Sequence, residues 1–214
     1  TGEIISAEDL GGARVHTQIS GGADHFCANQ VEAVTRVREI LALDRPQTLH
    51  THRYAEVPPA VPPETLYDLM PSAIHQGIDG RAILEAIADD SYFIEYKRDY
   101  APGRGDNILC GKIRIQGIPV GVVCSNAVGI IFAEAARKAA EWIVRCSQEK
   151  TPLLFVQNAP GYMIGSESEH QGIGKYGSDM VRAVSCAPVP RLQGVIGPDT
   201  GAATILESDP RGGA

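Results

Sequence analysis

The sequence predicts an α/β protein in which helices pack on a sheet. Segments with strand character alternate with segments of helical periodicity from about residue 108 to residue 196, in the order strand, strand, helix, strand, helix, strand. In addition, 43% of the 214 residues are hydrophobic, which is enough for a substantial core. This combination is typical of layered α/β folds.

Residues 1–44 open with a glycine-containing loop and continue into one amphipathic helix, "VEAVTRVREILAL". Asp24 and His25, which precede this helix, could belong to a catalytic relay, but Ser20 lies on no recognisable nucleophile motif. The apolar residues that share one face of the helix are Val31, Val34, Val37, Ile40 and Leu41.

Residues 44–80 hold six of the 14 prolines, which interrupt ladder hydrogen bonding and predict an extended connector. His50 and His52 could ligate a metal, but no third ligand is evident, so we interpret them as solvated and expect no metal site. Arg81–Ile87 is predicted to be a short helix that follows the connector.

The segment "GKIRIQGIPVGVV" predicts a hairpin, because alternating apolar residues flank a turn at Gln116 and Gly117. A helix is expected next, and we assign its oppositely charged pair Glu134 and Lys138, four residues apart, to a solvated face. The apolar positions of this helix are Phe132, Ala136, Ala139, Ala140 and Ile143.

The last elements are a strand, a helix and a strand. Leu153–Val156 is predicted as a short buried strand, and Arg191–Ile196 as a further strand that ends at Gly197. Between them, a helical stripe is formed by Ile173, Tyr176, Met180 and Val184.

The composition argues against several classes of partner. With 19 Lys+Arg against 26 Asp+Glu, the net charge is −7, and no basic block is present, so we expect no nucleic-acid partner. We also expect no membrane span, because no apolar run approaches about 20 residues. The five cysteines are scattered and form no C-x-x-C pair, which is typical of reduced thiols in a cytoplasm.

Two glycine-rich junctions follow predicted strands, at Asn158–Gly174 and at Gly197–Ala203. In layered α/β folds, ligands bind where strands end and helices begin, because free backbone N–H groups converge there. Two such junctions on neighbouring strands could form an oxyanion hole. For an isolated glycine-rich turn, a simple chain reversal is the favoured interpretation.

Four stretches of the sequence together resemble one protein family: "TGEIISAEDLGGARVHTQISGGADHF", "GKIRIQGIPVGVVCSN", "FAEAARKAAEWIVRCSQEKTPLLFVQNAPGYMIG" and "GIGKYGSDMVRAVSCAPVP". They are similar to the carboxyltransferase (β) subunit of biotin-dependent acyl-CoA carboxylases. Gln157-Asn158 and the loop Gly161–Gly165 look closest to the methylcrotonyl-CoA and geranyl-CoA branch. The resemblance runs from Thr1 to about Ala203.

The resemblance implies two crotonase-like domains built from strand-strand-helix repeats, of which this chain is a partial copy. Residues 1–43 resemble the end of the first domain, and residues 44–107 form a connector that contains the short helix. Residues 108–214 resemble the first half of the second domain, apart from an unmatched tail at 204–214. We therefore expect an internal piece of a longer protein.

The resemblance also implies the chemistry. Carboxybiotin on a carrier domain and an acyl-CoA are the expected cofactor and substrate, and backbone N–H groups would stabilise the enolate and ureido oxygens. The biotin-side donors would be Gly201, Ala202 and Ala203. The facing wall, with Tyr162 and Met163 as apolar cover or as loop anchors, would be Gly161, Tyr162, Met163, Ile164 and Gly165.

The family implies a biotin carboxylase/biotin carrier (α) subunit as partner, self-association, and a location in the cytoplasm or in the mitochondrial matrix of a eukaryote. Two alternatives stay open. A crotonase-type hydratase or isomerase would use an acidic residue such as Glu167 or Glu169 near the substrate. A non-catalytic assembly fragment would bind neither biotin nor acyl-CoA.

Overall fold

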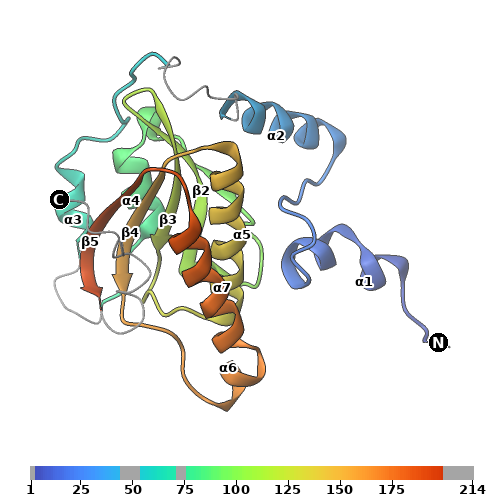
Figure 1. Ribbon diagram of the computed structural model, residues 1–214. Helices are drawn as coiled ribbons and strands as arrows, with labels where there is room; N and C mark the ends of the chain where they lie inside the picture. Colours follow the sequence, from blue (N-terminus) through green and yellow to red (C-terminus); the bar gives the residue numbers. More distant parts are fainter. Residues whose placement is uncertain (1–2, 44–53, 71–75, 200–214) are drawn as a thin grey trace.

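A five-stranded sheet forms the centre of the computed structural model, which describes residues 3–43, 54–70 and 76–199 (Figure 1). Its strands, in spatial order, are β1 (Ile94–Tyr96), β2 (Ile108–Ile115), β3 (Ile118–Ser125), β4 (Leu153–Ala159) and β5 (Arg191–Asp199). The first three strands are antiparallel, whereas β3, β4 and β5 are parallel. The predicted α/β class is confirmed.

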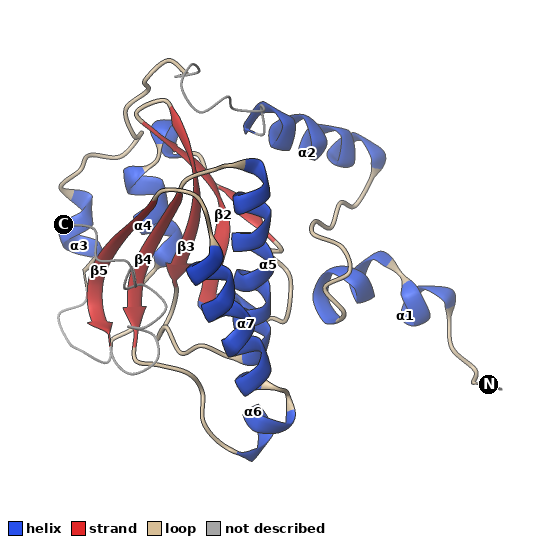
Figure 2. Ribbon diagram, in the orientation of Figure 1, coloured by secondary structure: helices blue, strands red, loops and turns tan. Residues whose placement is uncertain are grey.

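Helices cover both faces of the sheet (Figure 2). On one face lie α5 (Ala133–Glu149) and α7 (Ile173–Cys186), whose apolar residues share a core with Phe155 of β4. On the other face, α4 (Gly80–Ile87) packs against Leu109 and Val156 in a second core, and α3 (Thr65–Leu69) lies at its margin. The predicted helices are confirmed, and α5 extends six residues beyond the last apolar position named for it, Ile143.

The β2–β3 hairpin is confirmed in its register. Ile115 pairs with Ile118 around a two-residue turn in which Gln116 and Gly117 have φ angles of 50° and 75°. Two consecutive positive φ values are typical of a type I′ turn, whose twist matches that of the strands. The three-residue strand β1 had no sequence signal, because it is too short to show alternation.

The parallel strands are longer than their apolar residues predict. β4 continues through the buried polar residues Gln157 and Asn158 to Ala159, and β5 continues past Gly197 to Asp199. The prediction that the last strand ends at Gly197 was therefore wrong. Polar side chains can occupy buried strand positions when neighbouring groups bond them, as the 2.9 Å hydrogen bond from Gln193 Nε2 to Gln157 Oε1 illustrates.

The assignment of Glu134 and Lys138 to a solvated face was also wrong. Lys138 is fully buried between α5 and the sheet, and Glu134 is half-buried, with its Oε1 3.5 Å from Arg104. The i, i+4 spacing shows that two residues share a helix face, but it does not show what covers that face.

The N-terminal segment contacts the sheet layers from the side. It contains α1 (Ala7–Gly11), a π-helix (Val15–Ile19) and α2 (Gln30–Leu43), so the predicted helix at 31–43 is confirmed. Lys97, which is buried, donates to Gly21 O at 2.7 Å and lies 2.5 Å from a Glu141 carboxylate oxygen of α5. Most of the apolar face of α2 stays exposed.

The connector is extended only in part. In its described residues, Tyr54 N donates to Gly117 O at 3.0 Å, so the chain crosses the tip of the hairpin, but α3 then interrupts the extended course. Residues 44–53 and 71–75, including His50 and His52, lie outside the described residues. α4 and β1 also belong to the region expected to be a connector, yet both pack into the layers. The domain boundaries themselves stay a prediction.

Candidate active site at the carboxyl ends of the parallel strands

The carboxyl ends of β3, β4 and β5 meet at one edge of the sheet, and each leads into a glycine-containing segment (Figure 2). After β3 comes the turn at residues 126–131, and after β4 comes the glycine loop, residues 161–165. The segment that follows β5 begins at residue 200, outside the described residues. This edge is where open α/β sheets bind ligands.

Backbone hydrogen bonds hold the glycine loop against the turn after β3. Ile131 N donates to Gly161 O at 3.0 Å, and Met163 N donates to Ile131 O at 2.9 Å. The Met163 N–H is therefore engaged and is not a donor for a ligand. Gly161 and Gly165 have φ angles of 133° and 123°, which side chains rarely tolerate, so the loop requires glycine at both ends.

The side chains of the loop differ in their surroundings. The Tyr162 ring packs on Gly177 of α7, where an added Cβ would lie 3.1 Å from the ring, and it contacts the main core. The Met163 side chain is partly exposed, and Ile164 is 85% exposed. Tyr162 thus anchors the loop to α7, whereas Ile164 faces outward.

Arg104 connects the acidic residues beside the loop. It bonds Glu134 of α5 and Glu167 of α6 (Ser166–His170). The hydrogen bond and charge of Arg104 lower the pKa of the exposed Glu167 carboxyl, which therefore stays ionised and paired. A general base needs a raised pKa and a free lone pair toward substrate, so this geometry does not favour the hydratase alternative at Glu167. Glu169 is exposed on the same short helix.

Asn158, which sequence reasoning used only to indicate a branch of the family, occupies the centre of this edge. It is 2% exposed, and Gly129 of the turn after β3 and Gly197 of β5 lie against it. Gly201, Ala202 and Ala203 lie outside the described residues, so their convergence with the glycine loop stays a prediction.

Ser20, which the sequence places before Asp24 and His25, is bonded to other residues. Ser20 Oγ lies 3.0 Å from His16 Nδ1 rather than near His25, and it also accepts a bond from Gly22 N. Within residues 3–43, 54–70 and 76–199, no group of three or more potential metal-ligating His, Cys, Asp or Glu side chains is present. No helix in that part of the chain is long and apolar enough to cross a membrane.

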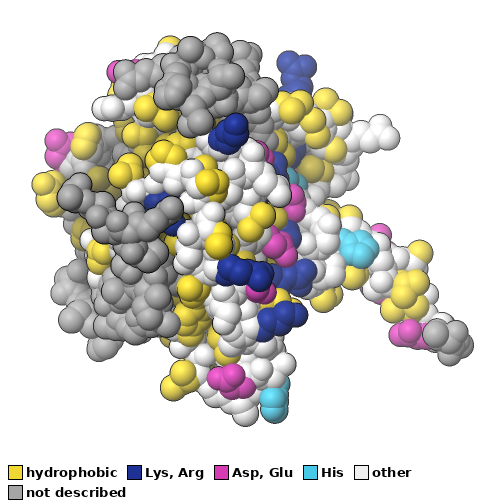
Figure 3. Space-filling view, viewed as in Figure 1, with side chains coloured by type: hydrophobic (Ala, Val, Ile, Leu, Met, Phe, Trp, Pro, Cys, Tyr) yellow, Lys and Arg dark blue, Asp and Glu magenta, His cyan; other side chains and the backbone are white. Residues whose placement is uncertain are grey.

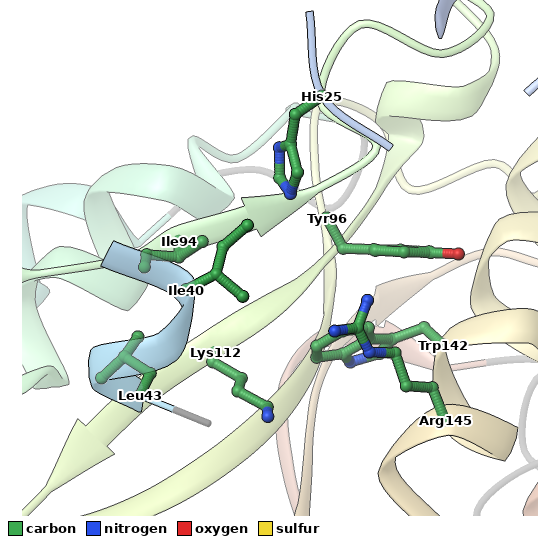
Figure 4. Close-up of a pocket in the computed structure, with 8 residues that line it drawn as sticks. All are labelled: His25, Ile40, Leu43, Ile94, Tyr96, Lys112, Trp142 and Arg145. Carbon is green, nitrogen blue, oxygen red and sulfur yellow. The ribbon is translucent and has the colours of Figure 1, made fainter. Parts of the chain in front are cut away.

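A small cavity separates α2 from the sheet (Figure 4). His25 faces it from the N-terminal segment, and Tyr96, Trp142 and Arg145 face it from the other side. Its volume of about 30 Å³ has room for about one water molecule, so it is no substrate pocket. Burial lowers the pKa of His25, and nearby Arg36 and Arg145 lower it further.

Comparison with known proteins identifies the family. Residues 1–208 match the carboxyl transferase domain family. The chain belongs to this family. It is 37% identical over 203 residues to the methylcrotonoyl-CoA carboxylase beta chain, mitochondrial, of Dictyostelium discoideum, covering 94% of this chain and 34% of that protein. It is 39% identical to the biotin-dependent 3-methylcrotonyl-coenzyme A carboxylase beta1 subunit of Mycobacterium tuberculosis, covering 94% of this chain and 37% of that protein.

Solved structures of carboxyl transferase proteins share the fold. The beta subunit of P. aeruginosa geranyl-CoA carboxylase matches with a TM-score of 0.66 at 38% identity, covering 96% of this chain and 38% of that one. Transcarboxylase 12S, a hexamer crystallised with hydrolysed methylmalonyl-coenzyme A, matches with a TM-score of 0.80 at 30% identity, covering 91% and 38%. The predicted crotonase-like fold class is confirmed. This chain spans about a third of the length of the Dictyostelium discoideum and Mycobacterium tuberculosis relatives.

Proposed function

We propose that this chain is part of the carboxyltransferase component of a biotin-dependent acyl-CoA carboxylase, with an acyl-CoA such as 3-methylcrotonyl-CoA as acceptor. The observation that carries the proposal is the match along residues 1–208 to a family whose members include methylcrotonyl-CoA carboxylase beta chains. An α subunit with biotin carboxylase and carrier domains is the proposed partner, and the proposed location is the cytoplasm or the mitochondrial matrix.

The glycine loop fits a ligand that carries a developing negative charge. Bound carboxybiotin supplies the carboxyl group for transfer. Among the described residues, the N–H groups of Gly161, Ile164 and Gly165 have no hydrogen-bond partner, and an added Cβ at Gly165 would meet no atom within 4 Å. We therefore narrow the donors on this loop to Gly161, Ile164 and Gly165, with Gly201, Ala202 and Ala203 as the other donors.

In this arrangement the chain orients the reactants and supplies no side-chain base. Backbone N–H groups that point at the enolate or ureido oxygen stabilise charge as it develops, and each such donor contributes about 3 to 4 kcal/mol in comparable sites. Tyr162, fixed against Gly177, would hold the loop while the exposed Ile164 side chain would cover the bound reactants. Arg104 would keep α6 beside them.

Replacing Ala202 with Pro in the full-length protein tests this proposal. The substitution removes one N–H group and fixes φ, so carboxyl transfer should fall about a hundredfold or more while acyl-CoA affinity is nearly unchanged. Ala202→Gly retains the N–H and is the matched control. Loss of acyl-CoA binding with intact biotin turnover would contradict the assignment.

The isolated 214-residue chain separates the fragment interpretation from its alternatives. We expect little or no carboxylation of methylcrotonyl-CoA by this chain, even with carboxybiotin supplied. The resemblance assigns acyl-CoA binding mainly to the part of the family's first domain that residues 1–214 do not match. Robust turnover would assign a catalytic role to residues from Thr204 onward. Hydration or isomerisation of an enoyl-CoA that is lost on Glu169→Gln would support the hydratase alternative.

A further inference from the structure

Asn158 is a buried polar side chain at the point where the three parallel strands end. Side chains alternate along β4, so Asn158 lies on the same face as Leu154 and Val156, in the layer covered by α4. Its Oδ1 is buried without a hydrogen-bond donor among the residues that the structure describes. A buried acceptor without a donor lowers stability, and such exceptions are expected at functional or strained sites.

Two glycines provide the space that Asn158 occupies. A Cβ added at Gly129 would lie 1.7 Å from the backbone carbonyl oxygen of Asn158, and one added at Gly197 would lie 2.0 Å from the side-chain Oδ1 of Asn158. By contrast, a Cβ at Gly194, on the same strand, would meet its nearest atom, Phe155 O, at 4.0 Å. Within β5, the need for glycine is thus confined to Gly197, the position that touches the Asn158 side chain.

The register between β4 and β5 changes at this residue. Gln157 pairs with Val195 and Ala159 pairs with Asp199, so Asn158 alone faces the three residues between them. Such bulges bend a strand and redirect the chain that follows, and they are frequent beside active sites. The Asn158 side chain fills the space inside this bulge, against Gly197.

We propose that Asn158 is a positioning residue of the carboxyl-transfer site. Its side chain, wedged against Gly197, fixes the bulge in the pairing of β4 with β5, and its backbone carbonyl group lies against Gly129 in the turn after β3. The glycine loop that follows β4 carries proposed backbone donors, so Asn158 sets the placement of this loop relative to β5. The contact between the Asn158 side chain and Gly197, here called the wedge, is inferred from geometry alone. The catalytic consequence of the wedge rests on the proposed function.

Stability measurements on the 214-residue chain test the wedge directly. Gly197→Ala should raise the unfolding equilibrium constant by at least about tenfold, whereas the matched control Gly194→Ala should change it by less than about threefold. Asn158→Ala removes the Cγ and Oδ1 atoms with which the new Cβ would collide. The unfolding equilibrium constant of the double variant Asn158→Ala/Gly197→Ala should therefore be about fivefold or more below the value expected if the two single effects multiplied. Multiplicative effects, or equal effects at the two glycines, would overturn the proposal.

Two further readouts separate positioning from general stability. In Asn158→Ala, amide hydrogen exchange should accelerate at residues 195–197 of β5 but not at residues 110–113 of β2. In the full-length protein, the same variant should lower kcat for carboxyl transfer about tenfold or more with little change in KM for acyl-CoA. If the wild-type protein transfers no carboxyl group, the proposed function fails while the exchange and coupling data still decide the wedge. Unchanged exchange at residues 195–197 would refute it.

Discussion

Lys138 is among the largest fully buried side chains of the described chain, and its Nζ has no hydrogen-bond partner there. Glu95, Asp106 and Arg81 interact electrostatically with Lys138. Glu95 already accepts two hydrogen bonds from Arg81. Burial lowers the pKa of the Lys138 ammonium group, because the charged form loses its hydration. A buried lysine without a direct partner lowers stability.

Replacing Lys138 with Met should therefore preserve or raise the free energy of unfolding at neutral pH, by about 1 kcal/mol or more, because the apolar side chain of similar length needs no proton or partner. Lys138→Ala should instead lower it by about 2 to 5 kcal/mol through the cavity it leaves. Lys175→Met, at an exposed lysine of α7, is the control. Equal destabilisation by Met and Ala would show that the ammonium group makes a favourable contact.

The same variant should change the pH dependence of stability. The unfolded chain binds a proton at Lys138 below the ordinary pKa of 10.5, whereas the folded protein binds it only at lower pH. Wild-type stability should therefore fall as pH falls from 10.5 toward the folded pKa, and the Met variant should lack this loss. Urea unfolding across this range, with the wild-type and variant curves subtracted, isolates the effect of this group.

His25 is a second titratable residue whose environment disfavours its charged form. Burial is the main cause of its lowered pKa, Arg36 and Arg145 add to it, and Asp24 and Asp99 oppose it. The contact of the N-terminal segment should thus be intact above the ordinary pKa of 6.5 and weaken as pH falls below it. His25→Gln should abolish this dependence. An imidazole titration by NMR at or above 6.5 would rule the effect out.

The glycine loop and α7 offer a matched pair of substitutions at the scale of elements. Neither Gly165 nor Gly174 has an atom within 4 Å of an added Cβ, but Gly165 has a φ of 123° and Gly174 is helical. Gly165→Ala should lower the free energy of unfolding by about 1 to 3 kcal/mol through backbone strain. Gly174→Ala should raise it by about 0.5 to 1 kcal/mol. Urea unfolding measures both, and a harmless Gly165→Ala would show that the loop conformation is not fixed.

Arg104 illustrates how elements distant in sequence are joined beside the loop. It lies between β1 and β2, yet it contacts the first turns of both α5 and α6. Ion pairs between exposed groups contribute little to stability, because solvent screens them, so Arg104 orients α6 more than it stabilises the protein.

At the scale of the whole molecule, the exposed large apolar side chains include two groups that each lie on one element. One is the face of α2, where Val31, Val34 and Leu41 are exposed, and Figure 3 shows hydrophobic side chains grouped over this helix. The other is the edge strand β5, where Leu192 and Val195 are exposed. Apolar patches and open strand edges of this kind mark association surfaces.

We therefore expect the chain to self-associate at micromolar concentration. Sedimentation velocity should show species larger than a monomer, and the double substitution Val34→Lys/Leu41→Lys should reduce them by adding charge to the apolar face. Glu32→Lys, on the same helix but outside the apolar face, is the control. A single monomeric species at about tens of micromolar would contradict this expectation.

The sequence by itself determined the elements whose signals are local. Periodicity located α7, the positive-φ pair Gln116 and Gly117 specified the hairpin register, and apolar runs placed the cores of β4 and β5. The glycine-rich junctions were also found from the sequence, because only glycine permits the φ angles now seen at Gly161 and Gly165.

The tertiary structure decided what each face contacts. It buried Lys138, left the apolar stripe of α2 exposed, engaged the Met163 N–H and set two glycines against Asn158. None of these follows from local pattern, because periodicity shows which residues share a face but not which element covers it, and a backbone donor is free or occupied only once a distant strand is in place.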